Sequence, residues 1–230
     1  MAFSLSGNTL KIIAALSMLL DHAGLLLFPE IKFLRIIGRL AFPIFSFMIA
    51  EGCKYTKNKP RYFLSVFLLG LLCQIVYFIF TKSLYMNILI TFSLSITVIY
   101  SLDYFRSFLL LKTSSTIKKL SAFLLLFLTI SLVCVLNILF KIDYGFWGCM
   151  TGVFASIIKK GSNTQRVFVF AIGLLILAIS SNTIQLYSLF SLPLLLLYSG
   201  KRGKIKMKSF FYIFYPLHLI VLEIINTFTN

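Results

Sequence analysis

Long apolar runs separated by short polar stretches fill nearly the whole chain. Runs of this length predict helices that span a membrane, whereas a transmembrane β-barrel would show short alternating segments. The sixth and seventh runs are short, so eight or ten spans are alternatives to nine. The pattern predicts an all-α polytopic transmembrane helical bundle, one integral-membrane domain over residues 1–230, with spans at 10–28, 33–52, 62–80, 85–102, 120–140, 146–158, 167–180, 183–199 and 210–228.

Composition and charge support this assignment and predict the orientation. Charged residues make up only 12% of the chain, against about a quarter in soluble domains, so soluble classes are excluded. The net charge of +16 comes from basic stretches at 54–61, 106–119, 159–166 and 201–208, and the intervening loops carry little charge. By the positive-inside rule, this alternation predicts a cytoplasmic N-terminus and no nucleic-acid partner. The spacing of the four cysteines predicts no metal site.

The first run contains Asp21 and His22 well inside it. An ionisable group in hydrocarbon costs about 2.5–3.5 kcal/mol on insertion scales, so we expect a structural or functional reason for both. Lys11 precedes His22 by eleven residues, which places both on one helix face about 16 Å apart. Arg39 in the second, antiparallel span has the depth of Asp21, and we expect the two to pair. This pair would act as a clamp, or would also set the tautomer or proton affinity of His22 through Asp21.

The remaining polar positions include a second histidine and several residues for which a structural role is expected. His218 lies near mid-membrane in the last span, just after Pro216, and we expect it to share a polar site with His22. Glu51 ends the second span, where it is expected to reach the surface or Lys54. Pro43 is expected to kink that span. The segment Asp143–Tyr144–Gly145 is expected to form a turn, followed by an aromatic interface anchor.

Six segments in order along the chain resemble the TraX family of membrane proteins, which are associated with N-acetylation of pilin subunits. They are LKIIAALSMLLDHAG (10–24), RIIGRLAFPIFSFMIAEGCKYTKN (35–58), NILITF (87–92), DYG with a nearby Gly (143–148), LPLLLLYSGKRG (192–203) and FFYIFYPLHL (210–219). A weaker likeness extends to the wider integral-membrane acyltransferases, whose first span carries a basic residue, ten intervening residues and a histidine. Lys11 and His22 fit that spacing, with Lys in place of the commoner Arg.

The resemblance implies a multi-span enzyme of the bacterial cytoplasmic membrane that takes acetyl-CoA, or another acyl-CoA, from the cytoplasm. Its acceptor would be an exported peptide, a pilin or a surface glycan. His22 would act as general base or acyl carrier, and Asp21 would orient it. His218 or Tyr215 would donate a hydrogen bond to the developing oxyanion. Binding of the two substrates would fall to Lys11 at the entry, Arg202 and Lys204 on the CoA phosphates, and Arg39 on an anionic part of the acceptor.

Two other classes of function remain open at this stage. A proton-coupled transporter also places Asp, His, Arg and Glu inside its spans, and it would show pH-dependent flux without acyl-CoA. A non-enzymatic accessory protein would use the same charges as assembly clamps and would co-purify with a partner.

Overall fold

The computed structural model describes residues 4–111 and 114–229, where the regular structure is helical apart from two isolated bridges between loops. Residues 112 and 113, inside the basic stretch 106–119, lie outside this description. The helices are α1 (Gly7–Leu26), α2 (Lys32–Gly38), α3 (Ala41–Tyr55), α4 (Lys59–Thr81), α5 (Ile88–Leu110), α6 (Thr116–Leu139), α7 (Gly145–Ile157), α8 (Asn163–Ser180), the 3-10 helix η1 (Thr183–Phe190), α9 (Ser191–Leu196) and α10 (Lys208–Thr229).

Each of the nine predicted runs corresponds to a helical segment. In the described part of the chain, seven helices are long and apolar enough to cross a membrane, with α2 and α3 together counted as one. The two remaining segments, 145–157 and 183–196, are apolar but shorter. The chain is therefore a multi-pass membrane protein with an all-α fold. A total of nine crossings and a cytoplasmic N-terminus stay predictions.

The expected kink at Pro43 is replaced by a break four residues earlier. Helix α2 ends at Gly38, and α3 begins at Ala41, so Pro43 falls in the first turn of α3. A proline is harmless there because the first backbone N–H groups of a helix have no intrahelical partner. The break places Arg39 at the junction of the two helices, which matters for the site described below.

Helix starts follow ordinary capping chemistry. The Ser6 side chain accepts from the Thr9 N–H at the start of α1, and Asn58 caps α4, which has Pro60 in its first turn. Ser162 and Gln165 form a reciprocal capping box at α8. These polar side chains satisfy N–H groups that a helix leaves unpaired, and they help fix where each helix begins.

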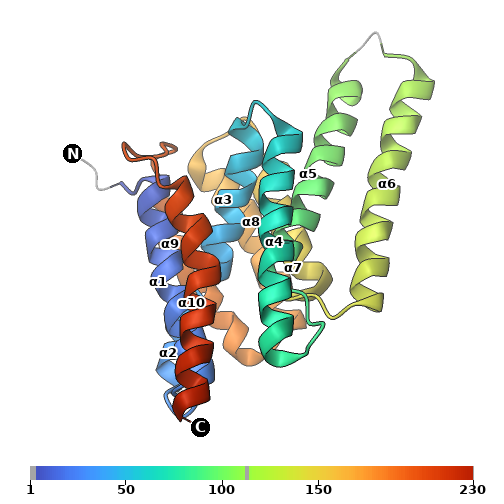
Figure 1. Ribbon diagram of the computed structural model, residues 1–230. Helices are drawn as coiled ribbons and strands as arrows, with labels where there is room; N and C mark the ends of the chain where they lie inside the picture. The colour runs from blue at the N-terminus through green and yellow to red at the C-terminus, as the bar shows by residue number, and fades with distance from the viewer. Residues whose placement is uncertain (1–3, 112–113, 230) are drawn as a thin grey trace.

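The helices pack into a bundle in which α1 and α10 lie side by side, although they open and close the chain (Figure 1). The core lies around α3, with Phe47 and Ile44 fully buried against Leu10, Phe170 and Ile96. Helices α4, α6 and α10 present long apolar faces to the outside, as expected for surfaces in contact with lipid.

The two ends of the bundle differ in charge. Residues 4–6 and the loops at 56–58, 158–162 and 197–207 lie at one end, which we call the basic end (Figure 1). The loops at 27–31, 82–87 and 140–144 and the last turn of α10 lie at the other, which we call the far end. The basic stretches 54–61, 159–166 and 201–208 therefore lie at one end, and so do the described residues of the fourth stretch, where α5 ends and α6 begins, as the predicted topology requires.

Candidate functional site

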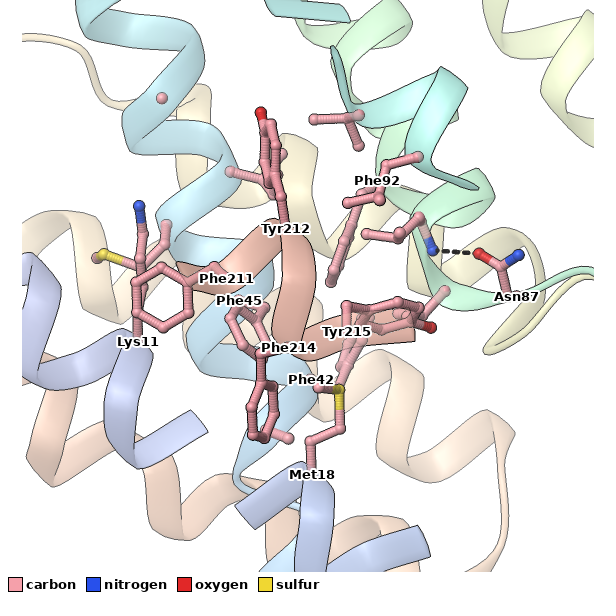
Figure 2. A pocket seen from close by; sticks show the side chains of 18 of the residues that line it. Lys11, Met18, Phe42, Phe45, Asn87, Phe92, Phe211, Tyr212, Phe214 and Tyr215 are labelled. Carbon is pink, nitrogen blue, oxygen red and sulfur yellow. Dashed lines mark hydrogen bonds between the residues drawn. The ribbon is translucent and has the colours of Figure 1, made fainter. Parts of the chain in front are cut away.

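A cavity of about 950 Å³ runs through the bundle. Its wall includes α1 residues from Gly7 to Leu25, a length of about 27 Å at the helical rise per residue. Figure 2 shows the aromatic side chains of α3 and α10 around it, among them Phe42, Phe45 and Phe214. Polar groups line the two ends, and mainly apolar groups line the middle. Such a mixture is typical of sites that hold an extended ligand.

An ion pair at the far end confirms the predicted contact between Asp21 and Arg39. Both residues are buried, and the Arg39 guanidinium donates to Asp21 Oδ2. Arg35 was not predicted to take part, but its Nη1 donates to the same oxygen at 2.8 Å. Gly38 makes this possible because a Cβ there would overlap the Asp21 side chain.

Arg39 is also bound by two further groups of the protein. Its Nη1 donates to the Tyr144 hydroxyl at 3.3 Å and to Gln185 Oε1 at 3.4 Å. With Asp21 as its counter-charge, this guanidinium has three protein partners. The geometry therefore favours the predicted pairing with Asp21 over the alternative in which Arg39 holds an anionic acceptor.

The two histidines of the chain lie in direct contact. His22 Nδ1 and His218 Nε2 are 2.9 Å apart, and the two rings are nearly parallel. His22 lines the cavity, while His218 is buried behind it with 5% of its surface exposed. The expected shared position of the two histidines is thus present. The group that hydrogen-bonds the His22 ring is His218, whereas Asp21 is bound to the two arginines.

The partners of His218 fix the tautomer of both rings. His218 Nδ1 lies 2.9 Å from the Phe214 carbonyl, which can only accept, so Nδ1 must carry the proton. In a neutral ring, Nε2 then carries a lone pair and accepts from His22 Nδ1–H. The neutral His22 ring is left with its lone pair on Nε2. This arrangement makes His22 Nε2 the basic atom of the pair.

At the basic end, the cavity wall includes Lys11 and Arg202. Backbone bonds hold Arg202 beside α1, since Gly7 N donates to the Lys201 carbonyl and Asn8 N to the Arg202 carbonyl. Lys204 is exposed on the same loop and is not part of the cavity wall. Two cations thus flank the basic end of the cavity, where an anionic ligand is favoured.

Tyr215 of α10 lines the middle of the cavity and is buried. It packs with Met18, Ala41 and Cys73 in a small apolar cluster. The Tyr215 ring also lies edge-on to His218, with 5.5 Å between the ring centres. Its phenol is therefore held beside the histidine pair.

Glu51 differs from the expectation of a surface side chain. It is 4% exposed and accepts a bond from Arg166 Nη2 of α8, whose guanidinium lies over the Phe47 ring. Sequence reasoning missed this pair because Arg166 was counted among loop charges. The one signal in the sequence is that Glu51 follows Phe47 by one helical turn, which places the carboxylate on the same helix face as this apolar side chain.

The turn before α7 was expected to be a simple turn at the membrane surface, but its side chains also form part of the cavity wall. Asp143 and Tyr144 both line the cavity, and the Tyr85 hydroxyl donates to Asp143 Oδ1 at 3.0 Å. Burial raises the pKa of Asp143 to about 6, although Tyr85 and Arg39 act in the opposite direction.

Among residues 4–111 and 114–229, no three His, Cys, Asp or Glu side chains gather to hold a metal ion.

Comparisons with known proteins place the chain in a family. It is 27% identical over 245 aligned positions to a protein named as the probable fimbrial assembly protein FimC of Dichelobacter nodosus, covering 94% of each chain. It is 39% identical over 101 residues to the uncharacterized protein RP591 of Rickettsia prowazekii, which covers 44% of this chain and 38% of that protein. No solved structure matches. A family model described as TraX protein matches residues 6–226, and the chain therefore belongs to the TraX family.

Proposed function

We propose that this protein is an integral-membrane acyltransferase that uses acetyl-CoA or a related acyl-CoA. The observation that carries the proposal is the His22–His218 pair, which faces a cavity that extends to the basic end of the bundle. A neutral imidazole with a defined lone pair, buried in a largely apolar cavity, suits a general base. Cations at the entry suit an anionic co-substrate.

The acyl donor would enter at the basic end. Lys11 and Arg202 would hold the CoA phosphates, with the exposed Lys204 at the rim. The thin pantetheine arm would then extend along α1 past apolar side chains. Lys11 and His22 are about 16 Å apart along the helix, so the arm would carry the thioester toward the histidine pair.

In the reaction, the acceptor N–H or O–H would lose its proton to His22 Nε2 as its heteroatom attacks the thioester carbon. The C–S bond then breaks, and the CoA thiolate takes the proton back from His22. The same lone pair could instead accept the acyl group covalently. His218 has no free N–H, because Nδ1 is bound to Phe214 and Nε2 accepts from His22. The oxyanion role therefore passes to the Tyr215 hydroxyl.

The acceptor would be met at the far end, beyond the membrane if the basic end faces the cytoplasm. An exported peptide or pilin fits this location, and the fimbrial assembly name of the Dichelobacter nodosus relative supports it. A surface glycan fits the same geometry. The site of action would be the bacterial cytoplasmic membrane.

Replacement of His22 by alanine tests the proposal directly. Purified protein in lipid nanodiscs is supplied with labelled acetyl-CoA and acceptor, and transfer is expected to fall by at least about 100-fold, the usual contribution of a general base. Leu16→Ala is the matched control, because Leu16 lies on the same helix, is 55% exposed and does not line the cavity. Full transfer by His22→Ala would contradict the proposed role of His22 as a general base or acyl carrier.

A proton-coupled transporter is the second candidate. It is favoured by the length of the cavity, which has ionisable groups toward both ends. Reconstituted vesicles distinguish the two functions, since a transporter gives pH-dependent flux without acyl-CoA. An assembly factor without activity would bind no acyl-CoA and would co-purify with its partner.

A further inference from the structure

The turn that joins α6 to α7 has an unusual backbone. Tyr144 has φ of 59° and Gly145 has φ of 61°, so two successive residues adopt the left-handed conformation. Glycine adopts it readily, but a tyrosine does so only when its surroundings impose it. A strained residue beside a cavity is a common mark of a functional position.

Hydrogen bonds to α5 and to the segment before it impose this conformation. Met86 N donates to the Lys141 carbonyl at 2.8 Å, and Asp143 N donates to the Met86 carbonyl at 2.9 Å. The Thr91 hydroxyl donates to the Asp143 carbonyl at 2.7 Å. Three hydrogen bonds thus tie the turn to α5 and to the residue just before it.

The result is a fixed orientation for two side chains. The Tyr144 ring stacks on Phe42 with 4.1 Å between the ring centres, and its hydroxyl accepts from Arg39. The Asp143 carboxylate accepts from Tyr85 and lines the cavity. Asp143 is only half-buried, since it faces this open space.

The carboxylates at the far end have different surroundings. Asp21 forms ion pairs with both Arg35 and Arg39, whereas no ion pair joins Asp143 to a lysine or arginine within the described residues. A carboxylate that faces a cavity without a cationic partner is suited to accept a hydrogen bond from a ligand. Arg39 connects the two places, since it contacts Asp21, the neighbour of His22, and Tyr144, the neighbour of Asp143.

We infer that Asp143 binds the acceptor: its carboxylate receives a hydrogen bond from the second N–H of the amine that takes the acyl group, or from an O–H adjacent to the hydroxyl that takes it. This inference rests on the proposed acyl transfer. In the step, the acceptor heteroatom bonds to the acyl carbon, its proton passes to His22 Nε2, and the C–S bond breaks. The sulfur leaves as thiolate and is protonated by His22, so charge and atoms balance. Asp143 orients the acceptor and keeps no proton.

A preference for acceptor class follows from this arrangement. An amine, or a hydroxyl with an adjacent O–H, offers the donor that Asp143 requires, whereas a carboxylate would meet Asp143 as a like charge. Arg35 and Arg39, which line the cavity at the far end, do not reverse this preference, because both already pair with Asp21.

The test uses the full chain in nanodiscs with labelled acetyl-CoA and three probes: glycinamide, methyl glucoside and succinate. Asp143→Asn keeps one oxygen for Tyr85 and replaces the other by an NH₂ donor. We expect its KM for the amine or hydroxyl probe to rise at least 10-fold, while the Kd of acetyl-CoA is unchanged. Tyr85→Phe removes the internal bond but keeps the carboxylate, so its KM should rise clearly less than that of Asp143→Asn.

Asp103→Asn is the matched control, since Asp103 is a buried carboxylate that pairs with Lys159 and does not line the cavity. Wild-type KM in Asp143→Asn, equal losses in Asp143→Asn and Tyr85→Phe, or acetylation of succinate alone would each overturn the inference and leave acyl transfer standing. Failure of the wild type to acetylate any probe would overturn both.

Discussion

At the scale of single residues, the site depends on which nitrogen of His22 carries the proton. The Phe214 carbonyl sets His218, and His218 in turn sets His22. This relay does for His22 what a carboxylate does for the histidine of a serine protease, namely hold one tautomer and one ring orientation. It differs in bringing no negative charge into the apolar cavity.

His218→Leu should therefore lower acyl transfer by about 10- to 1,000-fold, because His22 loses its acceptor and samples the wrong tautomer. His218→Gln can still accept from His22 Nδ1–H and should retain more activity than the leucine variant. Single-turnover rates with labelled acetyl-CoA measure both. Equal activity of His218→Leu and wild type would show that the contact between the histidines is structural only.

The sequence predicted part of this residue-level detail. Asp21 and Arg39 lie on consecutive antiparallel helices, so depth alone was enough to pair them. Glu51 and Arg166 are 115 residues apart, and loop counting placed the arginine outside the bundle. The direct bond between His22 and His218 also depends on how α10 docks on α1, which no local pattern encodes.

At the scale of elements, the break between α2 and α3 is the feature that organises the far end. It lets one short helix supply Arg35 while the junction supplies Arg39, so both reach a single carboxylate on α1. The apolar pattern predicted one continuous span here. A pattern of hydrophobicity reports burial along an axis, and it contains little information about where that axis is interrupted.

Gly38→Ala should disrupt this junction. The added methyl group would overlap Asp21 and push its carboxylate away from the arginines. We expect a loss of stability of about 1–3 kcal/mol, as for overpacking in other close contacts, together with reduced activity. Thermal unfolding in detergent measures the first effect. Gly145→Ala is a useful comparison, because space is open there and only the backbone is strained.

At the scale of the whole molecule, two buried ion pairs tie the bundle together at opposite ends. Asp21 joins α1 to the α2–α3 junction, and Glu51 joins α3 to α8. The cavity lies between helices that these pairs hold in place. Its existence could not be predicted from the sequence, since it depends on how aromatic side chains from α3 and α10 fill the space between helices.

Glu51→Ala should leave Arg166 charged and unpaired among apolar side chains, at a cost of about 3–5 kcal/mol in the free energy of unfolding. The double variant Glu51→Leu, Arg166→Met removes both charges and should recover most of that loss. Denaturant unfolding followed by Trp147 fluorescence measures these differences. A single variant as stable as the wild type would mean that Arg166 finds water or another partner.

The separation of the two histidines along the chain has a consequence for biosynthesis. Asp21 meets its counter-charges within 18 residues, so a nascent chain can neutralise it as soon as the second hydrophobic segment leaves the ribosome. The partner of His22 lies 196 residues later in the chain, since His218 belongs to α10. Premature termination between α8 and α10 therefore yields a product in which the ion pairs of Asp21 and Glu51 can form but the histidine pair cannot.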